Sequence, residues 1–416
     1  MAASICFLSV VGLECGAYYT CRHTYEPTLI AELATAGIGG AVYAHPGVVY
    51  TPGHSGRLSG AALVDPVYAL QVVPDVRIVR SESTTGIARA ALAILASRGD
   101  DGQGGGAWEG SAGWDIVPHG SLAVHALVPD MCKGSPKPKM SARVERVAEL
   151  VRDGMRKRHR FARPCDGHEA PAGGAPSATS GAPGAASERW LLQLLLLEAD
   201  TLAISLCRCR AMGPIGGCWP NWRRPAGLAS EALAPSSSIG AMPSSAYRKL
   251  LEALDCMGAA LTPGQTVVDL GASPGSWTAA LRKHDCAVIA VDRSPLDSAL
   301  MADPRVTFVE GDAFSFSPLE ARPGWPGASV DWLVSDVIAY PERVFPLLQA
   351  WCGGRWATEG LIVTMKFKGQ EPHLAALSAA LDAARALGYA ARAKHFFSNK
   401  NEVTIMLAPS SVGEEG

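Results

Sequence analysis

Short runs of apolar residues, each followed by a longer amphipathic stretch, make up the chain from Ser244 onward. This alternation of strand-like and helix-like segments predicts an α/β domain, in which a mostly parallel sheet is covered by helices on both faces. The predicted strands are residues 266–270, 287–291, 306–309, 330–335, 361–367, 390–397 and 403–407.

The N-terminal half has a less regular mixture of short strands and helices, which predicts an α+β fold. In the helix predicted over residues 142–158, Val144, Val147, Val151 and Met155 form one apolar stripe at helical spacing. The other predicted elements are strands at 5–11, 48–50, 76–79, 122–128 and 191–197 and helices at 26–36 and 85–97.

Two segments of low complexity interrupt this half. Residues 98–113 are dominated by Gly and Asp, and residues 163–188 by Pro, Ala, Gly and Ser. Neither has enough apolar surface to offset its ordering entropy, so both are interpreted as insertions. The predicted organisation is a segment 1–97, the insertion 98–113, a domain 114–218 that includes the insertion 163–188, a linker 219–243 and the α/β domain 244–410.

Composition limits the class of protein. A chain of 416 residues is long enough for two or three domains, and its net charge of −2 means that nucleic-acid binding must come from local basic patches. Its 11 cysteines include no C-x-x-C pair, which favours reduced thiols. No Lys or Arg precedes Arg22, and the apolar residues 5–13 are too few to span a bilayer, so we expect a soluble cytoplasmic protein.

Two basic clusters are candidate RNA contacts. The first cluster is equally well explained as a solvated helix end, and the tryptophans beside the second by packing between the two halves of the molecule. The first cluster consists of Arg156, Lys157, Arg158 and Arg160. The second consists of Arg208, Arg210, Arg223 and Arg224, beside Trp219 and Trp222.

A buried strand that ends in a glycine-containing turn lies at residues 267–277, Val-Val-Asp-Leu-Gly-Ala-Ser-Pro-Gly-Ser-Trp. In doubly wound sheets, such a turn before a helix holds an adenosine-containing ligand. The glycines do not follow the G-x-G-x-x-G spacing of the dinucleotide fingerprint. Taken alone, the turn is as often an ordinary strand-to-helix connection as a ligand cradle.

Acidic residues follow the next strands. Asp292 ends the second strand, where a carboxylate can accept both hydroxyls of a ribose, and Asp312 follows the third, within reach of an adenine amino group. Asp336 follows the fourth. Each carboxylate alone is explained by capping of the next helix, whereas their joint occurrence at consecutive strand ends favours a ligand site.

Two lysines and a glutamate are further candidates for the site at these strand ends. Lys366 lies near the end of an apolar strand, where burial of an ammonium is costly. Lys249 precedes the first strand, and Glu402 lies in the final hairpin. A snorkelling lysine or a surface glutamate explains each residue by itself.

In order and context, these motifs resemble those of the FtsJ/RrmJ-like ribose 2′-O-methyltransferases, whose K-D-K-E tetrad matches Lys249, Asp336, Lys366 and Glu402. The resemblance implies a Rossmann-like methyltransferase domain of seven strands with an antiparallel final strand. It also implies S-adenosylmethionine as cofactor. The sequence shows no cluster of metal-ligand residues, so we expect no metal. The implied cofactor-binding residues are Ser245, Asp269, Gly271, Ser273, Pro274, Gly275, Ser276, Trp277, Asp292, Asp312 and Asp336.

The chemistry of the reaction gives the tetrad its roles. A ribose 2′-hydroxyl is a poor nucleophile until a base removes its proton, and a lysine does so when burial and a neighbouring ammonium lower its pKa. We assign Lys366 as the base and Lys249 as that ammonium, oriented by Asp336 and Glu402. Lys368, two positions on, points to the same face, which leaves the choice between Lys366 and Lys368 open.

The resemblance is nearest to family members that methylate a cytidine ribose in large-subunit 23S-type rRNA, and whose ferredoxin-like and THUMP regions bind RNA. It therefore implies that residues 1–97 are ferredoxin-like, that 114–218 are THUMP-like, and that rRNA or a precursor particle is the partner. Ser276 departs from the family's Pro-Gly-Gly-Trp turn, and Ala246 from an expected serine. The alternatives are the same reaction on tRNA or another rRNA site, and a non-catalytic RNA-binding factor.

Overall fold

The computed structural model divides into two compact units. Residues 1–64, 71–171 and 180–209 form the first unit, and residues 65–70, 172–179 and 210–416 form the second. The predicted strand 5–11 and the insertion 98–113 lie outside the described residues. The structure describes residues 16–52, 64–96, 121–130, 137–157, 164–165, 189–211, 215, 218–221, 242–318, 329–368 and 374–410.

The second unit is built on a seven-stranded sheet in the order β14-β13-β12-β15-β16-β18-β17. The strands from β14 to β16 are parallel, and β18 is inserted antiparallel between β16 and β17. All seven predicted strands, including the antiparallel last strand, are confirmed. They are β12 (Thr266–Leu270), β13 (Ala287–Asp292), β14 (Val306–Glu310), β15 (Val330–Ser335), β16 (Ala357–Lys366), β17 (Tyr389–Lys394) and β18 (Glu402–Pro409).

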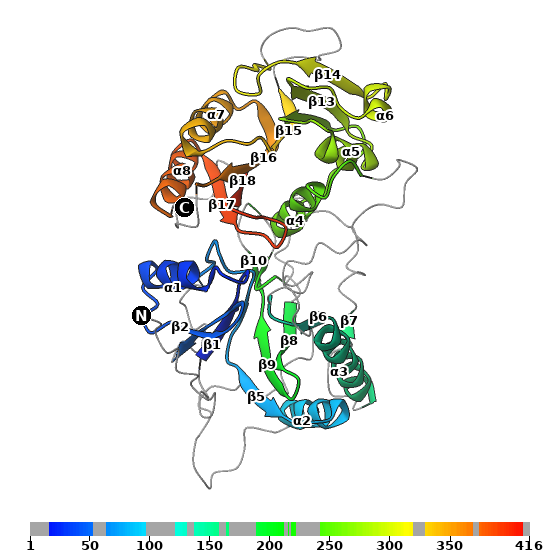
Figure 1. Ribbon diagram of the computed structural model, residues 1–416, viewed down its shortest axis with the longest axis vertical. Helices are drawn as coiled ribbons and strands as arrows, with labels where there is room; N and C mark the ends of the chain where they lie inside the picture. The colour runs from blue at the N-terminus through cyan, green and yellow to red at the C-terminus, as the bar shows by residue number, and fades with distance from the viewer. Residues whose placement is uncertain are drawn as a thin grey trace, which may run out of the picture. The chain divides into compact units, whose positions relative to one another are not determined.

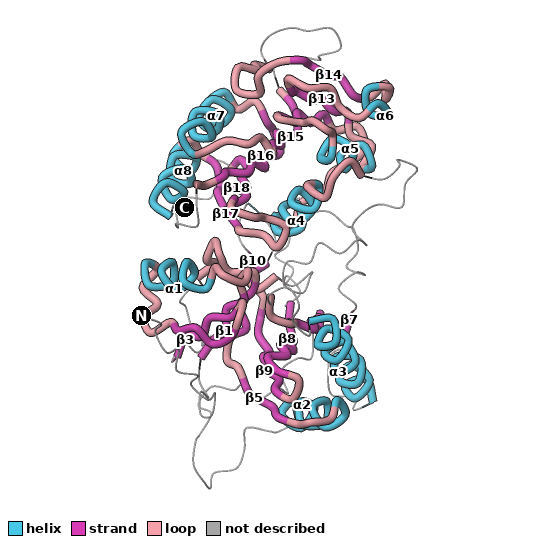
Figure 2. Tube along the Cα trace, viewed as in Figure 1, coloured by secondary structure: helices cyan, strands magenta, loops and turns pink. Residues whose placement is uncertain are grey.

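Helices cover both faces of this sheet, which is why its central strands are buried along nearly their whole length. Figures 1 and 2 show α4 and α5 on one side and α7 and α8 on the other. Strand β12 pairs with both β13 and β15, so the chain reverses its direction of winding at the carboxyl end of β12. The helices are α4 (Tyr247–Met257), α5 (Ser276–Lys283), α6 (Ser298–Met301), α7 (Pro341–Gly354) and α8 (Leu374–Ala386).

One sheet of the first unit has four antiparallel strands in the order β2-β3-β1-β4, beside helix α1 (Glu26–Thr35). The sequence predicted α1 and β3 but not β1, whose five residues are all buried between β3 and β4. The strands are β1 (Gly16–Thr20), β2 (Val42–His45), β3 (Val48–Pro52) and β4 (Gln71–Val73).

The other sheet of the first unit has five strands in the order β5-β9-β8-β6-β7, with helices α2 (Thr84–Ala96) and α3 (Lys137–Lys157). The predicted apolar stripe of α3, which includes Val147 and Val151, is buried in the core. Strand β5 lies within residues 1–97, yet it pairs with β9. The strands are β5 (Arg77–Arg80), β6 (Ser121–Leu127), β7 (Pro164–Cys165), β8 (Arg189–Glu198) and β9 (Thr201–Arg208).

Helices and largely antiparallel strands are thus both present in the first unit, and its assignment to ferredoxin-like and THUMP types stays a prediction. A further short pair, β10 (Arg210–Ala211) and β11 (Cys218–Trp219), belongs to the second unit. Within the described part of the chain, no helix combines the length and apolar character needed to cross a membrane.

Candidate active site

The turn after β12 is shaped by two glycines with positive φ. Gly271 has φ +75° and Gly275 φ +109°, values that residues with a side chain rarely adopt. The N–H groups of Gly271 and Ala272 both donate to the carbonyl of Val291, at 2.8 and 3.2 Å, which ties the turn to β13. Gly275 is the N-cap of α5. The turn therefore stands where the winding of the sheet reverses, which is the ligand position in open α/β sheets.

Ser276 and Trp277 bind the segment that leads into α4. The Ser276 hydroxyl donates to the carbonyl of Ser244 at 2.8 Å and accepts from the N–H of Tyr247 at 3.1 Å. The Trp277 indole N–H donates to the carbonyl of Ala246 at 2.8 Å. Both side chains are buried. Their polar groups thus serve to position α4, and their predicted contact with a cofactor stays a prediction.

The side chain of Asp292, the last residue of β13, contacts the glycine turn. Its carboxylate accepts the N–H of Ser273 at 3.0 Å and the N–H of Ser294 at 2.9 Å. Pro274 follows in the turn, and Ser245 is exposed before α4. The glycine turn and Asp292, both predicted to bind an adenosine-containing ligand, are therefore neighbours. The Asp292 side chain is half-buried.

Asp312, after β14, lies in a cationic setting that the sequence analysis did not predict. The N–H of Phe314 donates to its carboxylate at 3.1 Å, and the guanidinium of Arg293 lies 2.6 Å away. Chiefly through the Phe314 bond, and then through Arg293, the pKa of Asp312 is lowered from its ordinary value. Arg343 lies 3.4 Å from the same carboxylate, and its guanidinium stacks 3.8 Å from the Phe314 ring centroid. A ligand amino group at Asp312 would share the carboxylate with these arginines.

Asp269, inside β12, is a buried carboxyl with one short hydrogen bond, from the Thr278 hydroxyl at 2.7 Å. Burial raises the pKa of Asp269 to about 7, although the Thr278 bond opposes the rise. Asp336 and Asp292 raise it further, because their charges repel a third carboxylate nearby. Asp269 therefore changes charge near neutral pH at the base of the glycine turn.

This shift predicts a pH dependence of stability. Between the ordinary pKa of 3.8 and about 7, the folded protein holds a proton on Asp269 that the unfolded chain releases. The free energy of unfolding therefore falls as pH rises through this interval, by about 1.4 kcal/mol per pH unit. Asp269→Asn removes this titrating group. Urea unfolding at pH 5, 6 and 8 is therefore expected to show the free energy of unfolding of the variant increasing relative to that of the parent as pH rises. Asp382→Asn, at an exposed position, is the control, and parallel pH curves for Asp269→Asn and parent would contradict the assignment.

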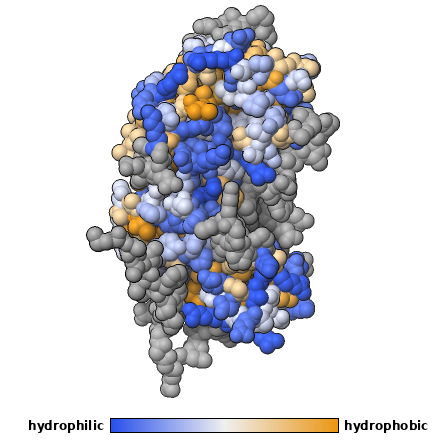
Figure 3. Space-filling model, viewed as in Figure 1, coloured by the Kyte–Doolittle hydropathy of each residue, from blue (hydrophilic) through white to orange (hydrophobic). Residues whose placement is uncertain are grey.

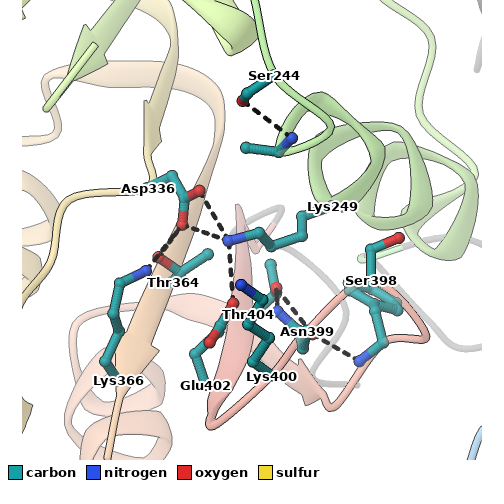
Figure 4. Close-up of polar contacts among 12 residues, drawn as sticks. Ser244, Lys249, Asp336, Thr364, Lys366, Ser398, Asn399, Lys400, Glu402 and Thr404 are labelled. Carbon is teal, nitrogen blue, oxygen red and sulfur yellow. Dashed lines mark hydrogen bonds and ion pairs between the residues drawn. The ribbon is translucent and has the colours of Figure 1, made fainter. Parts of the chain in front are cut away.

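The four predicted tetrad residues lie together at the carboxyl edge of the sheet (Figure 4). The Lys249 ammonium, on α4, donates to both carboxylate oxygens of Asp336, at 2.8 and 2.7 Å, and to Glu402 Oε1 at 3.0 Å. The Lys366 ammonium, at the end of β16, donates to Asp336 Oδ1 at 3.1 Å. Asp336 thus joins the two lysines, and Lys249 joins the two carboxylates.

The two lysines of the tetrad differ in burial. The side chain of Lys249 is 9% exposed, against 18% for Lys366. Burial disfavours the charge of Lys249, but Asp336 and Glu402 outweigh it and hold the pKa of Lys249 above its ordinary value. Lys249 is therefore a permanent ammonium at neutral pH, and Lys366 is the more accessible of the two amines.

Strand pairing explains how Glu402 reaches this cluster, and it also brings in Thr364, which sequence reasoning missed. Lys366 pairs with Glu402 across β16 and β18, and Thr364 pairs with Thr404. The Thr364 hydroxyl donates to Asp336 Oδ1 at 2.9 Å. Thr364 lies two positions before Lys366, and side chains at that spacing share a face of a strand, so the sequence did contain the signal.

Lys368 lies beside the Tyr340 ring. Lys368 is exposed, and its ammonium lies 4.8 Å from the ring centroid of Tyr340. The Lys366 ammonium lies 3.1 Å from Asp336, which also binds Lys249. The geometry thus favours Lys366 over Lys368 as the second lysine of the tetrad, and its role as base is taken up below.

The basic clusters have mixed outcomes. Arg156 is exposed and 3.4 Å from Asp153, and the Arg208 guanidinium lies 4.9 Å from the Trp190 ring centroid. Trp219 is 2% exposed, with the Lys394 ammonium 4.1 Å from its ring centroid. Of the two interpretations left open for Trp219, its burial favours packing over stacking on RNA. Arg158, Arg160, Trp222, Arg223, Arg224 and the side chain of Arg210 lie outside the described residues.

The sheet with its antiparallel last strand, the glycine turn at the reversal point and the lysine–carboxylate cluster define the class of this unit, a Rossmann-like methyltransferase domain. The FtsJ-like methyltransferase family matches residues 242–370. The second unit thus contains an FtsJ-like methyltransferase domain, and the expectation of an S-adenosylmethionine-dependent methyltransferase domain is confirmed at this level. Glu402 lies beyond the matched residues. Over the described ranges, no group of three or more His, Cys, Asp or Glu side chains is placed to hold a metal ion.

Relatives with curated names agree with this class. The chain is 38% identical over 143 residues to the ribosomal RNA large subunit methyltransferase M of Halorhodospira halophila, covering 34% of this chain and 39% of that protein. It is 30% identical over 223 residues to the protein of the same name from Marinobacter nauticus, covering 52% of this chain and 57% of that one. The resemblance to this branch of the family, expected from the motifs, is confirmed.

These alignments are partial, since the chain spans about two fifths of the length of the first relatives it matches. Among solved structures, the Methanococcus jannaschii fibrillarin pre-rRNA processing protein is 16% identical with a TM-score of 0.29, covering 36% of this chain and 69% of that one. A similarity of that size adds nothing to the assignment.

Proposed function

We propose that this protein transfers a methyl group from S-adenosylmethionine to a ribose 2′-hydroxyl of large-subunit rRNA, with a cytidine as the target. The observation that carries the proposal is the meeting of Lys249, Asp336, Lys366 and Glu402 beside the glycine turn. The relatives named ribosomal RNA large subunit methyltransferase M support rRNA as the substrate class. Such a substrate agrees with the cytoplasmic location expected from the sequence.

The residues at the reversal point fit an adenosine-containing cofactor. Asp292 offers a half-buried carboxylate for ribose hydroxyls, and Asp312 offers one for an adenine amino group. Gly271 and Gly275 give the turn a backbone conformation that residues with a side chain rarely adopt. When bound, S-adenosylmethionine supplies an electrophilic methyl group on its sulfonium.

The tetrad supplies the proton acceptor. The amine of Lys366 takes the proton of the ribose 2′-hydroxyl, and the new ammonium is stabilised by Asp336, 3.1 Å away. Lys249 stays charged between Asp336 and Glu402 and holds the Asp336 carboxylate in place beside Lys366. The protein's remaining contribution is to hold the hydroxyl oxygen in line with the methyl group.

A glycine substitution tests the cofactor turn. Gly275→Ala places a side chain at φ +109°, which is expected to cost about 1–3 kcal/mol of strain and to weaken S-adenosylmethionine binding by about tenfold, equivalent to ~1.4 kcal/mol. Gly264→Ala, at φ +90° with no atom within 4 Å of the added Cβ, is the control for backbone strain, whereas the added Cβ of Gly275→Ala also meets the Leu300 side chain. Calorimetric titration and urea unfolding should show a stability loss in both variants but weaker binding only in Gly275→Ala. Equal cofactor affinity in the two would remove the turn from the cofactor site.

We further propose that a THUMP-like region at residues 114–218, which includes helix α3 of the first unit, supplies RNA contacts. Helix α3 ends in exposed Arg156 and Lys157, and its apolar stripe is buried. Clustered Arg and Lys are the usual footprint of phosphate contact. Arg156→Gln and Lys157→Gln together are the variants that probe this surface, with rRNA affinity measured as a function of salt.

The direct test is transfer of labelled methyl from S-adenosylmethionine to unmodified large-subunit rRNA, followed by alkaline hydrolysis. We expect the label in alkali-resistant dinucleotides, because a 2′-O-methyl group blocks cleavage at that position. Label in ordinary mononucleotides means base methylation and refutes the role given to the tetrad. Absence of transfer to this rRNA, with transfer to tRNA, refutes the substrate; absence of transfer to both refutes the reaction.

A further inference from the structure

The loop that joins β15 to α7, residues 336–340, begins with Asp336 of the tetrad and presents an apolar surface beside it. Its side chains alternate in burial: Ala339 is buried, whereas Ile338 is 82% and Tyr340 39% exposed. Ile338 and Tyr340 are therefore large apolar groups directed to solvent next to the proposed reaction centre. Such groups beside a site mark a binding surface.

The inner side of this loop is anchored, so the outward direction of Ile338 and Tyr340 is fixed by the fold. A Cβ on Gly271 would lie 2.8 Å from the Val337 Cβ, which shows that Val337 packs directly on the glycine turn. The carbonyl of Ala339 accepts the backbone N–H of Lys366 at 3.0 Å. The loop is thus bound on one side to the cofactor turn and on the other to the strand that carries the proposed base.

A cation completes this surface. The ammonium of Lys368 lies 4.8 Å from the Tyr340 ring centroid, and the side chain is exposed. Aromatic rings beside Lys or Arg are the recurring means of holding single-stranded nucleic acid, because the ring stacks on a base and the cation neutralises a phosphate. Figure 3 shows a small hydrophobic patch surrounded by hydrophilic surface over the region of β15, β16 and α7.

Resting on the proposed function, we infer that Ile338 and Tyr340 form the surface that holds the base of the methyl-accepting nucleotide. The base is attached to the ribose carbon next to the one that bears the 2′-hydroxyl, so it must lie close to Lys366 when that hydroxyl does. Lys368 contacts the phosphate of the same nucleotide. The occupant is thus an unpaired nucleotide of RNA whose base has left its stack, rather than a base pair.

The test measures steady-state methyl transfer by the full chain with rRNA as the varied substrate. Tyr340→Ala is expected to raise KM for rRNA by about tenfold to hundredfold with little change in kcat, because stacking on one ring contributes that much to binding. Tyr340→Phe keeps the ring and is expected to restore the parent KM. Ile338→Ser should act in the same direction, whereas Met301→Ser, at a 43% exposed position on α6, is the matched control. S-adenosylmethionine affinity is expected to be equal in all four variants, and an unchanged KM in Tyr340→Ala overturns the inference.

A second measurement identifies the base. Once the methylated nucleotide is mapped, an RNA with an abasic residue at that position is compared with the intact RNA. The abasic change should raise KM for the parent enzyme but not for Tyr340→Ala, since both remove the same contact. Additive effects mean that the ring holds another base and overturn the assignment. If the parent transfers no methyl to rRNA, the proposed function fails instead, and equal rRNA affinities of parent and Tyr340→Ala in filter binding then refute the surface separately.

Discussion

Lys366→Met is expected to lower kcat for methyl transfer by about 10²- to 10⁴-fold, the usual contribution of a positioned general base. S-adenosylmethionine affinity should not change, because Lys366 contacts Asp336 and not the glycine turn in the proposed arrangement. The measurement is single-turnover transfer of labelled methyl to rRNA at saturating cofactor. A loss confined to kcat assigns Lys366 to the chemical step.

Lys366→Arg distinguishes a role of Lys366 as proton acceptor from a role as the cation paired with Asp336. Arginine keeps a cation beside Asp336, but a guanidinium does not release its proton in proteins. The variant is therefore expected to be as inactive as Lys366→Met, whereas a residue that only pairs with Asp336 would tolerate the change. Lys283→Met, on α5 of the same domain, is the control. Retained activity in Lys366→Arg would refute the base assignment, and a large loss of kcat in Lys368→Met would move the base to Lys368.

The fold of the second unit was predictable because its strands are buried on both faces. Strands β12 and β15 were located to the residue, since an apolar run bounded by polar turns has only one placement. Fewer elements of the first unit were predictable from the sequence. Strand β1, Gly16–Thr20, has no apolar–polar alternation, because all five residues are buried in the middle of a sheet. The pairing of β5 with β9 joins residues more than a hundred positions apart, which periodicity cannot reveal.

The site was predictable where its chemistry follows strand ends. Asp336, Lys366 and Glu402 meet because parallel strands end at one edge and the last strand runs back along β16. The pairing of the carboxylates with the lysines was harder to anticipate, because a sequence motif does not state which carboxylate binds which lysine. Lys249 was expected to act on Lys366 as a neighbouring ammonium, and the structure adds that two carboxylates hold it, which is what fixes its charge.

Lys249→Met is expected to destabilise the folded protein by about 3–5 kcal/mol, the usual cost of removing one partner from a buried ion pair. The Lys249 ammonium lies 2.7 Å from Asp336 and 3.0 Å from Glu402. Without it, two largely buried carboxylates face each other with only Lys366 to offset them. Activity should fall as well, because Lys249 holds the Asp336 carboxylate that contacts Lys366.

A double variant distinguishes a charge effect from a packing effect. The raised pKa of Lys249 means that its contribution is complete below the ordinary value of 10.5 and is lost only above the still higher folded value. The parent therefore keeps this stabilisation across pH 5 to 9. Glu402→Gln in the Lys249→Met chain removes one of the two facing carboxylates, so urea unfolding at pH 8 should show the double variant more stable than Lys249→Met. A double variant no more stable than Lys249→Met would mean that Lys249 contributes through packing alone.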